Sequence, residues 1–172
     1  MREITTGRYR MDIYRVFADH NIEYERHDHP AVFTVEEAKR LVPHLPGAKT
    51  KNLFLRDKKG RRHVLVVSGQ EKSVDLKALS TLLDSPTLSL ASPDRLKKYL
   101  GITPGAVSIL AVVNDTNNEV EVVVDRDLWN AKAFQCHPLV NTSTLVIPRD
   151  HLEHFLEVTG HEVRLLNVPA RD

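Results

Sequence analysis

The sequence predicts a mixed α+β fold, in which helices flank a largely antiparallel or mixed sheet. Apolar runs that pair as hairpins occur among helical patterns, and the chain does not alternate strictly between strand and helix. No internal repeat, low-complexity tract or long linker interrupts the 172 residues. We therefore expect a single domain that covers residues 1–172.

The composition is that of a soluble globular protein. Apolar residues make up 41% and charged residues 27% of the chain, and no apolar run approaches the length of a membrane span. Residues 1–6 lack the apolar core of a secretory signal, so we expect a cytoplasmic protein that does not bind membranes. A single cysteine, Cys136, excludes an internal disulfide framework and a multi-cysteine zinc site.

The first half of the chain carries clear start and stop signals. Apolar residues at helical spacing predict a helix over 8–18, and capping-box spacing from Thr34 predicts another that runs to about Leu41. The turn signal Asp57-Lys58-Lys59-Gly60 separates two strand-like runs, which predicts a hairpin. The expected strands are 22–26, 51–56 and 63–68, and leucines at helical spacing predict a helix over 74–83.

The second half shows the same mixture. Ser92-Pro93-Asp94 predicts a helix start and Gly101 its stop. A polar segment over 114–118 lies between two valine-rich runs, 107–113 and 120–124, and predicts a second hairpin. The other expected elements are strands over 88–91, 133–136, 143–147 and 162–168 and a helix over 148–158.

Positive charge is concentrated locally. Lys and Arg number 24 against 23 Asp and Glu, so only a local cluster can argue for binding of nucleic acid. One such cluster consists of Lys49, Lys51, Arg56, Lys58, Lys59, Arg61 and Arg62, with Asp57 as the one acid among them, and Arg95, Lys97 and Lys98 follow later. A solvated hairpin tip and a solvated helix face would give the same pattern.

Several familiar catalytic sites are absent from the sequence. It contains no phosphate-binding glycine motif and no His-Glu-x-x-His zinc motif. His151 and His154 lie among the polar positions of a predicted surface helix, so we expect no metal and no cofactor. Cys136 and His137 are adjacent on a predicted strand and point to opposite faces, so Cys136 is expected to be a small buried hydrophobe, not a nucleophile.

Two loops carry the remaining candidate chemistry. Gly101-Ile102-Thr103-Pro104-Gly105 could present backbone amides to an anion or a developing oxyanion, although a tight connection would also use two glycines and a proline. The bend over 137–142 offers His137 and Asn141 as hydrogen-bonding groups, although an isolated histidine at the end of a strand is often structural.

Three segments in a fixed order resemble a known family. The segments are TKNLFLRDKKGRRHVLVVSG (50–69), GITPGAVSILAVVND (101–115) and FQCHPLVNTSTLVI (134–147). They resemble the YbaK and prolyl-tRNA-synthetase-associated domain family, in particular its freestanding prolyl-tRNA editing proteins. The resemblance covers nearly the whole chain and implies a curved mixed sheet or partial barrel with helices packed around it.

The resemblance also implies a function and a site. It implies a hydrolase that removes a wrong amino acid, alanine in the most similar branch, from proline tRNA, with the acceptor stem and aminoacylated 3′ end of tRNA as its partner and prolyl-tRNA synthetase as a further one. Lys51, His137 and Gly105 are the implied catalytic residues. The expected substrate-binding residues are Asn52, Gly101, Pro104, Val140 and Asn141, and the expected tRNA-binding residues are Arg56, Lys58, Lys59, Arg61 and Arg62.

A physical mechanism can be derived for these residues. We expect the stem of Lys51 to be fixed by packing at the end of a buried strand, so that its ammonium can hold a terminal phosphate or ribose. Amides of the 101–105 loop stabilise the oxyanion, and a small pocket near His137 and Val140 admits alanyl and rejects prolyl by size. Water attacks, oriented by polar groups or by the terminal ribose hydroxyl. One alternative is a non-catalytic regulator that binds aminoacyl-tRNA or an amino acid, and the other is an editor of cysteinyl or seryl esters.

Overall fold

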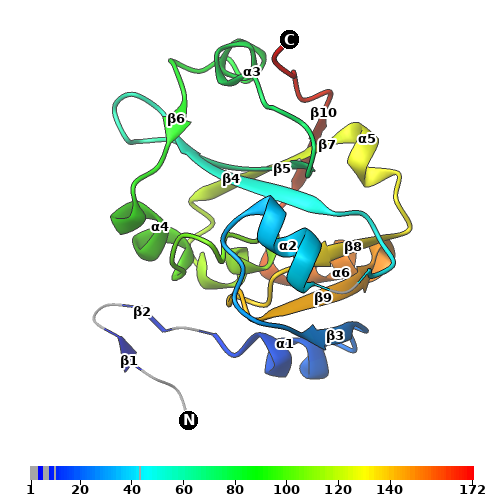
Figure 1. Ribbon diagram of the computed structural model, residues 1–172. Coiled ribbons are helices and arrows are strands. Elements are labelled where there is room, and N and C mark those ends of the chain that lie inside the picture. Colours follow the sequence, from blue (N-terminus) through cyan, green and yellow to red (C-terminus); the bar gives the residue numbers. More distant parts are fainter. Residues whose placement is uncertain (1–3, 6–7, 10, 43) are drawn as a thin grey trace.

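The computed structural model describes residues 4–5, 8–9, 11–42 and 44–172. Two β-sheets lie one above the other in Figure 1, and helices pack around them. In these residues no helix is both long and apolar enough to cross a membrane. The predicted mixed α+β class is confirmed, and the described strands form separate sheets without closing into a barrel.

The larger sheet has five strands in the order β10-β7-β5-β4-β6. Its members are β4 (Thr50–Arg56), β5 (His63–Gly69), β6 (Ser89–Leu90), β7 (Val120–Asp125) and β10 (Val163–Leu166). β4 pairs antiparallel with β5, so the predicted first hairpin is confirmed. The Asp57 carboxylate accepts hydrogen bonds from the amides of Arg61 (2.8 Å) and Arg62 (3.1 Å), which fixes the turn of that hairpin.

The smaller sheet has three antiparallel strands in the order β3-β9-β8. These strands are β3 (Glu25–Asp28), β8 (Ala133–Cys136) and β9 (Ser143–Pro148). Alternate residues of β9 point to opposite faces, and Leu145 and Ile147 are fully buried in the core. Two short strands, β1 (Ile4–Thr5) and β2 (Arg8–Tyr9), pair near the N-terminus.

Four of the six described α-helices begin at a polar residue whose side chain accepts hydrogen bonds from amides of the first turn. They are α1 (Ile13–Asp19), α2 (Val35–Leu41), α3 (Leu76–Leu82), α4 (Pro93–Leu100), α5 (Arg126–Trp129) and α6 (Arg149–Thr159). Thr34 and Ser92 cap α2 and α4 through their hydroxyl oxygens, and Gly101 ends α4 at φ 64°, as predicted. The first helix begins later than predicted because Asp12 caps it, and Arg8 and Tyr9 belong to β2. Residue 10 of that predicted helix lies outside the described residues.

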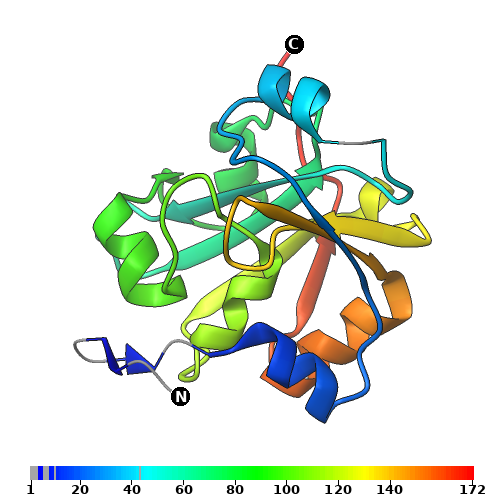
Figure 2. The same cartoon turned by 60° about the horizontal axis from the view of Figure 1, so that its bottom comes forward.

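Two apolar clusters pack on opposite faces of the larger sheet. The main cluster lies between the sheets and includes residues of α1, α4 and α6, such as Phe17, Leu100 and Phe155. The smaller cluster packs α3 against the other face, with Leu55 and Leu79 fully buried. Figure 2 shows α1 and α6 together below the sheets.

The predicted second hairpin is wrong. Its first arm forms the 3₁₀ helix η1 (Ile109–Asn114), which Ser108 caps through its hydroxyl. The apolar run is buried throughout, and a short continuous apolar run does not distinguish a strand from a buried helix. Its second arm, β7, instead pairs in parallel with β5 and β10.

The two sheets meet where β4 begins. Ala48 forms a bridge to Phe134 of β8, and its amide donates to the carbonyl oxygen of Ala133 at 2.9 Å. The Thr50 hydroxyl donates to the Gln135 carbonyl oxygen at 2.7 Å. Gly47 has φ 88°, and a Cβ built on it would lie 3.2 Å from the Ala133 backbone, so this close approach needs glycine. We call this junction the sheet seam.

Candidate active site

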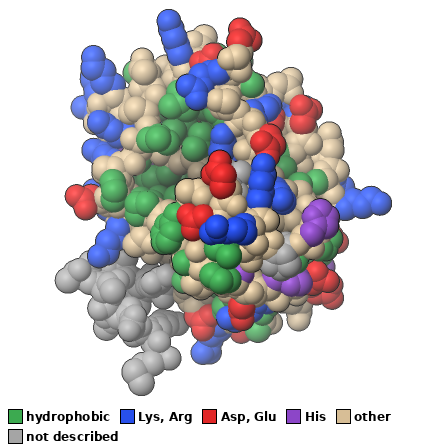
Figure 3. All heavy atoms as spheres, viewed as in Figure 1, with side chains coloured by type: hydrophobic (Ala, Val, Ile, Leu, Met, Phe, Trp, Pro, Cys, Tyr) green, Lys and Arg blue, Asp and Glu red, His purple; other side chains and the backbone are tan. Residues whose placement is uncertain are grey.

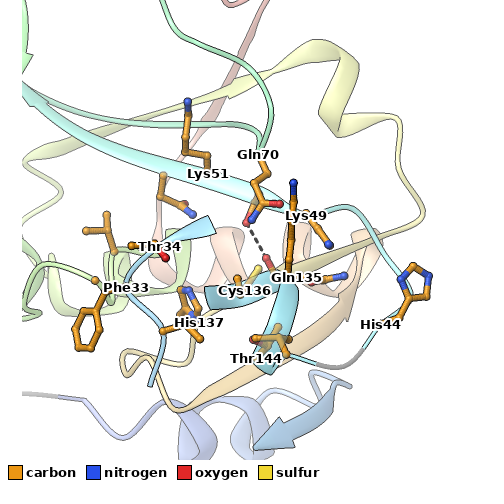
Figure 4. Close-up of a pocket in the computed structure, with 18 residues that line it drawn as sticks. Phe33, Thr34, His44, Lys49, Lys51, Gln70, Gln135, Cys136, His137 and Thr144 are labelled. Carbon is orange, nitrogen blue, oxygen red and sulfur yellow. Dashed lines mark hydrogen bonds between the residues drawn. The ribbon is translucent and has the colours of Figure 1, made fainter. Parts of the chain in front are cut away.

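A cavity of about 420 Å³ lies at the sheet seam. The start of β4, the end of β8, the segment that leads into α2 and the loop around Gly105 form its walls. Figure 4 shows side chains from these elements around one hollow. Three residues that the sequence assigned to catalysis, Lys51, Gly105 and His137, all line it. Segments that lie far apart in the sequence thus contribute to one site.

His137 is neutral and has a defined tautomer. Its Nδ1 lies 3.3 Å from the carbonyl oxygen of Ser143, which can only accept, so Nδ1 carries the hydrogen and Nε2 keeps its lone pair. Burial lowers the pKa of His137 and outweighs the effect of the Ser143 hydrogen bond, which acts to raise it. His137 can therefore accept a proton or a hydrogen bond at Nε2 near neutral pH.

Cys136 is not an available nucleophile. Its side chain is 4% exposed, and burial raises the pKa of the thiol to about 12. Only the thiolate attacks carbonyl carbon efficiently, and at neutral pH this thiol is protonated. The prediction that Cys136 is a small buried hydrophobe is confirmed.

Lys51 lines the cavity but does not point at His137. Its ammonium donates to the carbonyl oxygen of Lys72, and Figure 4 shows the side chain rising from β4 away from His137. Burial lowers the pKa of Lys51, and the positive charge of Arg171 lowers it further. The Lys51 charge is therefore placed at one end of the cavity and the His137 ring at the other.

Asn52 offers a hydrogen-bond acceptor to a ligand. It lines the same cavity, and its buried Oδ1 has no hydrogen-bond donor among the described residues. An unpaired buried polar atom costs free energy unless a bound molecule satisfies it. The substrate-binding role that the resemblance implies for Asn52 stays a prediction.

The loop from Gly101 to Gly105 divides into two parts. Gly105 lines the cavity at φ 90°, and a Cβ built on it would lie 3.2 Å from Cδ1 of Phe33. Gly101 instead ends α4, where Asn114 donates to the carbonyl oxygen of Leu100 at 2.9 Å. Among the residues expected to bind substrate, Gly101, Pro104, Val140 and Asn141 are not cavity-lining residues in the described structure.

Asn141 contacts two segments of the cavity wall without lining the cavity itself. Its Nδ2 donates to the carbonyl oxygen of Val32 at 3.3 Å, and it lies 3.7 Å from a Cβ built on Gly105. The bend over 137–142 is thereby tied to the segment that carries Phe33. Val140 is 40% exposed on the same bend.

The basic residues of the first hairpin do not share one role. Lys58, Lys59 and Arg61 are exposed at the turn, and Figure 3 shows Lys and Arg side chains along the left edge of the molecule, the side where α4 lies in Figure 1. Arg62 is engaged within the fold, because its guanidinium forms two hydrogen bonds to the Glu121 carboxylate at 2.5 and 2.8 Å and one to the Leu83 carbonyl oxygen at 2.7 Å. Arg56 contacts the backbone of its own turn.

A family profile identifies the chain. The aminoacyl-tRNA editing domain matches residues 29–155, which include the cavity residues Lys51, Gly105 and His137. This chain belongs to the aminoacyl-tRNA editing domain family. The predicted resemblance is thereby confirmed, and so is the predicted enzyme class, hydrolysis of an aminoacyl-tRNA ester, at the level of the family.

Relatives of this editing domain span most of the chain. It is 40% identical to the prolyl-tRNA editing protein ProX of Acetoanaerobium sticklandii over 147 residues, 86% of this chain and 90% of that protein. It is 42% identical to prolyl-tRNA synthetase associated domain-containing protein 1 of Danio rerio over 149 residues, 86% of this chain and 80% of that protein. A crystal structure described as a trans-editing enzyme for prolyl tRNA synthetase superposes with TM-score 0.63 at 19% identity, covering 95% of this chain and 98% of that one.

Several residues of the site were not predicted from the sequence. Phe33, Thr144 and Gln135 line the cavity, and the Gln135 amide donates to carbonyl oxygens of the loop over 45–47. These residue types are common in any fold, so only the tertiary structure identifies them as residues of the site. One signal in the sequence could have identified Phe33. It lies between Pro30 and the helix cap Thr34, outside any predicted helix or strand that would bury a large apolar side chain.

Proposed function

We propose that this protein hydrolyses the ester bond of mischarged aminoacyl-tRNA in trans, and that its substrate is proline tRNA that carries alanine. The observation that carries the proposal is the single cavity lined by Lys51, Gly105 and His137. These residues supply a cation for the RNA end, a backbone amide for the oxyanion and a proton acceptor. The names of its relatives, a prolyl-tRNA editing protein among them, support the same tRNA.

The acyl group occupies the end of the cavity near His137. A site built for proline cannot strongly exclude alanine, since missing methylene groups are worth only about 1–3 kcal/mol, and a second, smaller pocket corrects the error. In this proposal the end of the cavity near His137 accepts the methyl side chain of alanine and excludes the pyrrolidine ring of proline. Selection by size therefore belongs to this end of the site.

Hydrolysis needs an activated oxygen nucleophile and a stabilised oxyanion. His137 Nε2 accepts a hydrogen bond from the attacking water or from the terminal ribose hydroxyl, because its lone pair is free. The amide of Gly105 donates to the developing oxyanion, and one such donor contributes about 3 kcal/mol in other acyl-transfer sites. Cys136 remains protonated and takes no part as a nucleophile.

The RNA end enters from the side of Lys51. Phe33 is 70% exposed at the mouth of the cavity, and one side of its ring faces Gly105. Unpaired bases at RNA ends stack on exposed aromatic rings, so Phe33 receives the terminal base. The exposed cations of the first hairpin lie beyond the far end of β4. Five residues separate Lys51 from Arg56, which is about 17 Å at roughly 3.3 Å per residue of a strand. These cations contact phosphates of the acceptor stem.

A deacylation panel tests the proposal. Proline tRNA charged with alanine, proline, cysteine or serine is incubated with the protein, and release of labelled amino acid is followed. We expect alanine to be released fastest and proline to be retained. Faster release of cysteine or serine would reassign the substrate, and protection of every ester would indicate a binding protein instead of a hydrolase.

A further inference from the structure

Thr144 lies on the cavity side of the smaller sheet. Its neighbours Leu145 and Val146 continue β9, and Leu145 points into the core, so the alternation of the strand directs Thr144 to the opposite face. Thr144 is 6% exposed and lines the cavity together with His137. Its hydroxyl is therefore a polar group buried at the wall of the site.

The hydrogen bonds of His29 set the direction of the Thr144 hydroxyl. His29 Nδ1 lies 2.9 Å from the Pro30 carbonyl oxygen, which only accepts, so Nδ1 carries the hydrogen. When the His29 ring carries its single hydrogen on Nδ1, Nε2 is an acceptor, and the Thr144 hydroxyl at 2.8 Å donates its only hydrogen to it. Thr144 Oγ1 keeps two lone pairs and has no hydrogen left to offer, so toward the cavity it can only accept.

The charge distribution of the cavity is uneven. Figure 4 shows the nitrogen ends of Lys49 and Lys51 on the side away from Thr144 and His137. The His137 ring is neutral because burial lowers its pKa. A cationic group on a ligand is therefore repelled less at the Thr144 end, whereas phosphate is attracted to the other end.

We propose that Thr144 Oγ1 accepts a hydrogen bond from the free α-ammonium group of the bound aminoacyl ester, and that His29 is a positioning residue that keeps the hydroxyl in this orientation. The inference rests on the proposed function and specifies its substrate class. The site takes esters whose α-amino group is free, and it discriminates against esters whose amino group is acylated or missing.

The test compares two esters on the same tRNA. Alanyl-tRNA and propionyl-tRNA differ only by the α-amino group, and propionyl-tRNA is prepared by ribozyme acylation. Thr144→Val removes the oxygen while keeping the shape, and Thr144→Ser restores it. We expect Thr144→Val to lower kcat/KM on alanyl-tRNA by about tenfold or more, since hydrogen bonds to charged groups are among the stronger ones, and to change kcat/KM on propionyl-tRNA by less than threefold. Thr144→Ser should recover most of the loss.

His29→Ala provides a second arm. A positioning role predicts the same selective loss on alanyl-tRNA, whereas a purely structural role would lower the rates on both esters equally. Equal losses on both esters in Thr144→Val, or no loss on alanyl-tRNA, would overturn the assignment of Thr144. A parent protein that is inactive on both esters would overturn the proposed function itself, so the two failures are distinguishable.

Discussion

The Nδ1 of His137 lies 3.3 Å from the carbonyl oxygen of Ser143, and this contact turns the lone pair of Nε2 away from that backbone. Because the pKa of His137 is lowered by burial, the neutral ring persists below the ordinary histidine value of about 6.5. We expect kcat/KM to stay constant as pH falls to about 6.5 and to decline only below it.

His137→Ala should lower kcat/KM by about a hundredfold to ten-thousandfold, the range typical of a general base. The acid limb of the pH profile should disappear in the variant, which the same deacylation assay measures. An acid limb centred well above 6.5, or one that persists in His137→Ala, would contradict the assignment of His137 as the titrating base.

Replacement of Lys51 by methionine keeps the aliphatic stem and removes the charge. We expect kcat/KM on alanyl-tRNA to fall about tenfold to a hundredfold because the RNA end is no longer held in register. Lys77→Met, on the exposed surface of α3, is the matched control and should behave as the parent. A Lys51→Met protein as fast as the parent would remove this lysine from the proposed site.

The ring of Phe33 is expected to bind the terminal base. Phe33→Leu should weaken binding of uncharged tRNA, with a loss of about 1–3 kcal/mol in binding free energy, and Phe33→Trp should retain it. Binding is measured by titration with intact tRNA and with tRNA that lacks the terminal adenosine. If the parent binds both RNAs equally, the stacking role is wrong.

The exposed cations of the first hairpin are expected to bind phosphates. Simultaneous replacement of Lys58, Lys59 and Arg61 by alanine should weaken tRNA binding and reduce the slope of log Kd against log salt by roughly 0.7–0.9 for each phosphate that these side chains neutralise in the parent. Arg62→Ala should instead lower the melting temperature, because its half-buried guanidinium binds both the Glu121 carboxylate and the Leu83 carbonyl oxygen. An unchanged salt slope in the triple variant would exclude this surface.

The side chain of Asp115 is fully buried in contact with that of His161, which is also buried. Its carboxylate lies 2.8 Å from His161 Nε2 and accepts hydrogen bonds from the amides of Glu119 and Val120 at 3.0 and 2.8 Å. Asp115→Asn should reduce the free energy of unfolding by about 3–5 kcal/mol, the cost of leaving one partner of a buried pair uncompensated. Urea denaturation measures the loss, and a change below about 1 kcal/mol would contradict the pairing.

The same carboxylate makes stability depend on pH. Burial acts to raise the pKa of Asp115, but its hydrogen bonds and the charge of His161 hold it below the ordinary value. The folded-state pKa is thus below that of the unfolded chain, so this stabilisation is complete above about pH 4 and is lost as pH falls through the folded value. The acid limb of the stability curve should be shallower in Asp115→Asn.

Local signals in the sequence predicted much of the fold. Thr34 and Ser92 were recognisable helix caps, Gly101 a stop, and Asp57 to Gly60 a hairpin turn, because each acts on backbone groups within a few residues. The resemblance predicted the cavity residues Lys51, Gly105 and His137. A resemblance between motifs identifies residues but does not give the direction of their side chains. The direction of the Lys51 ammonium and the internal pairing of Arg62 were not predicted, because their partners, Lys72 and Glu121, are distant in the sequence.

The sequence by itself determined the α+β class, the first hairpin, the helix boundaries at Thr34, Ser92 and Gly101, and the family. Only the tertiary structure decided that Ile109–Asn114 is a 3₁₀ helix, that β7 pairs in parallel with β5 and β10, and that His29 and Thr144, 115 positions apart, share a hydrogen bond. The physical reason is the range of the interactions. Caps and turns satisfy neighbouring backbone groups, whereas strand partners and buried polar pairs depend on which distant segments exclude water together.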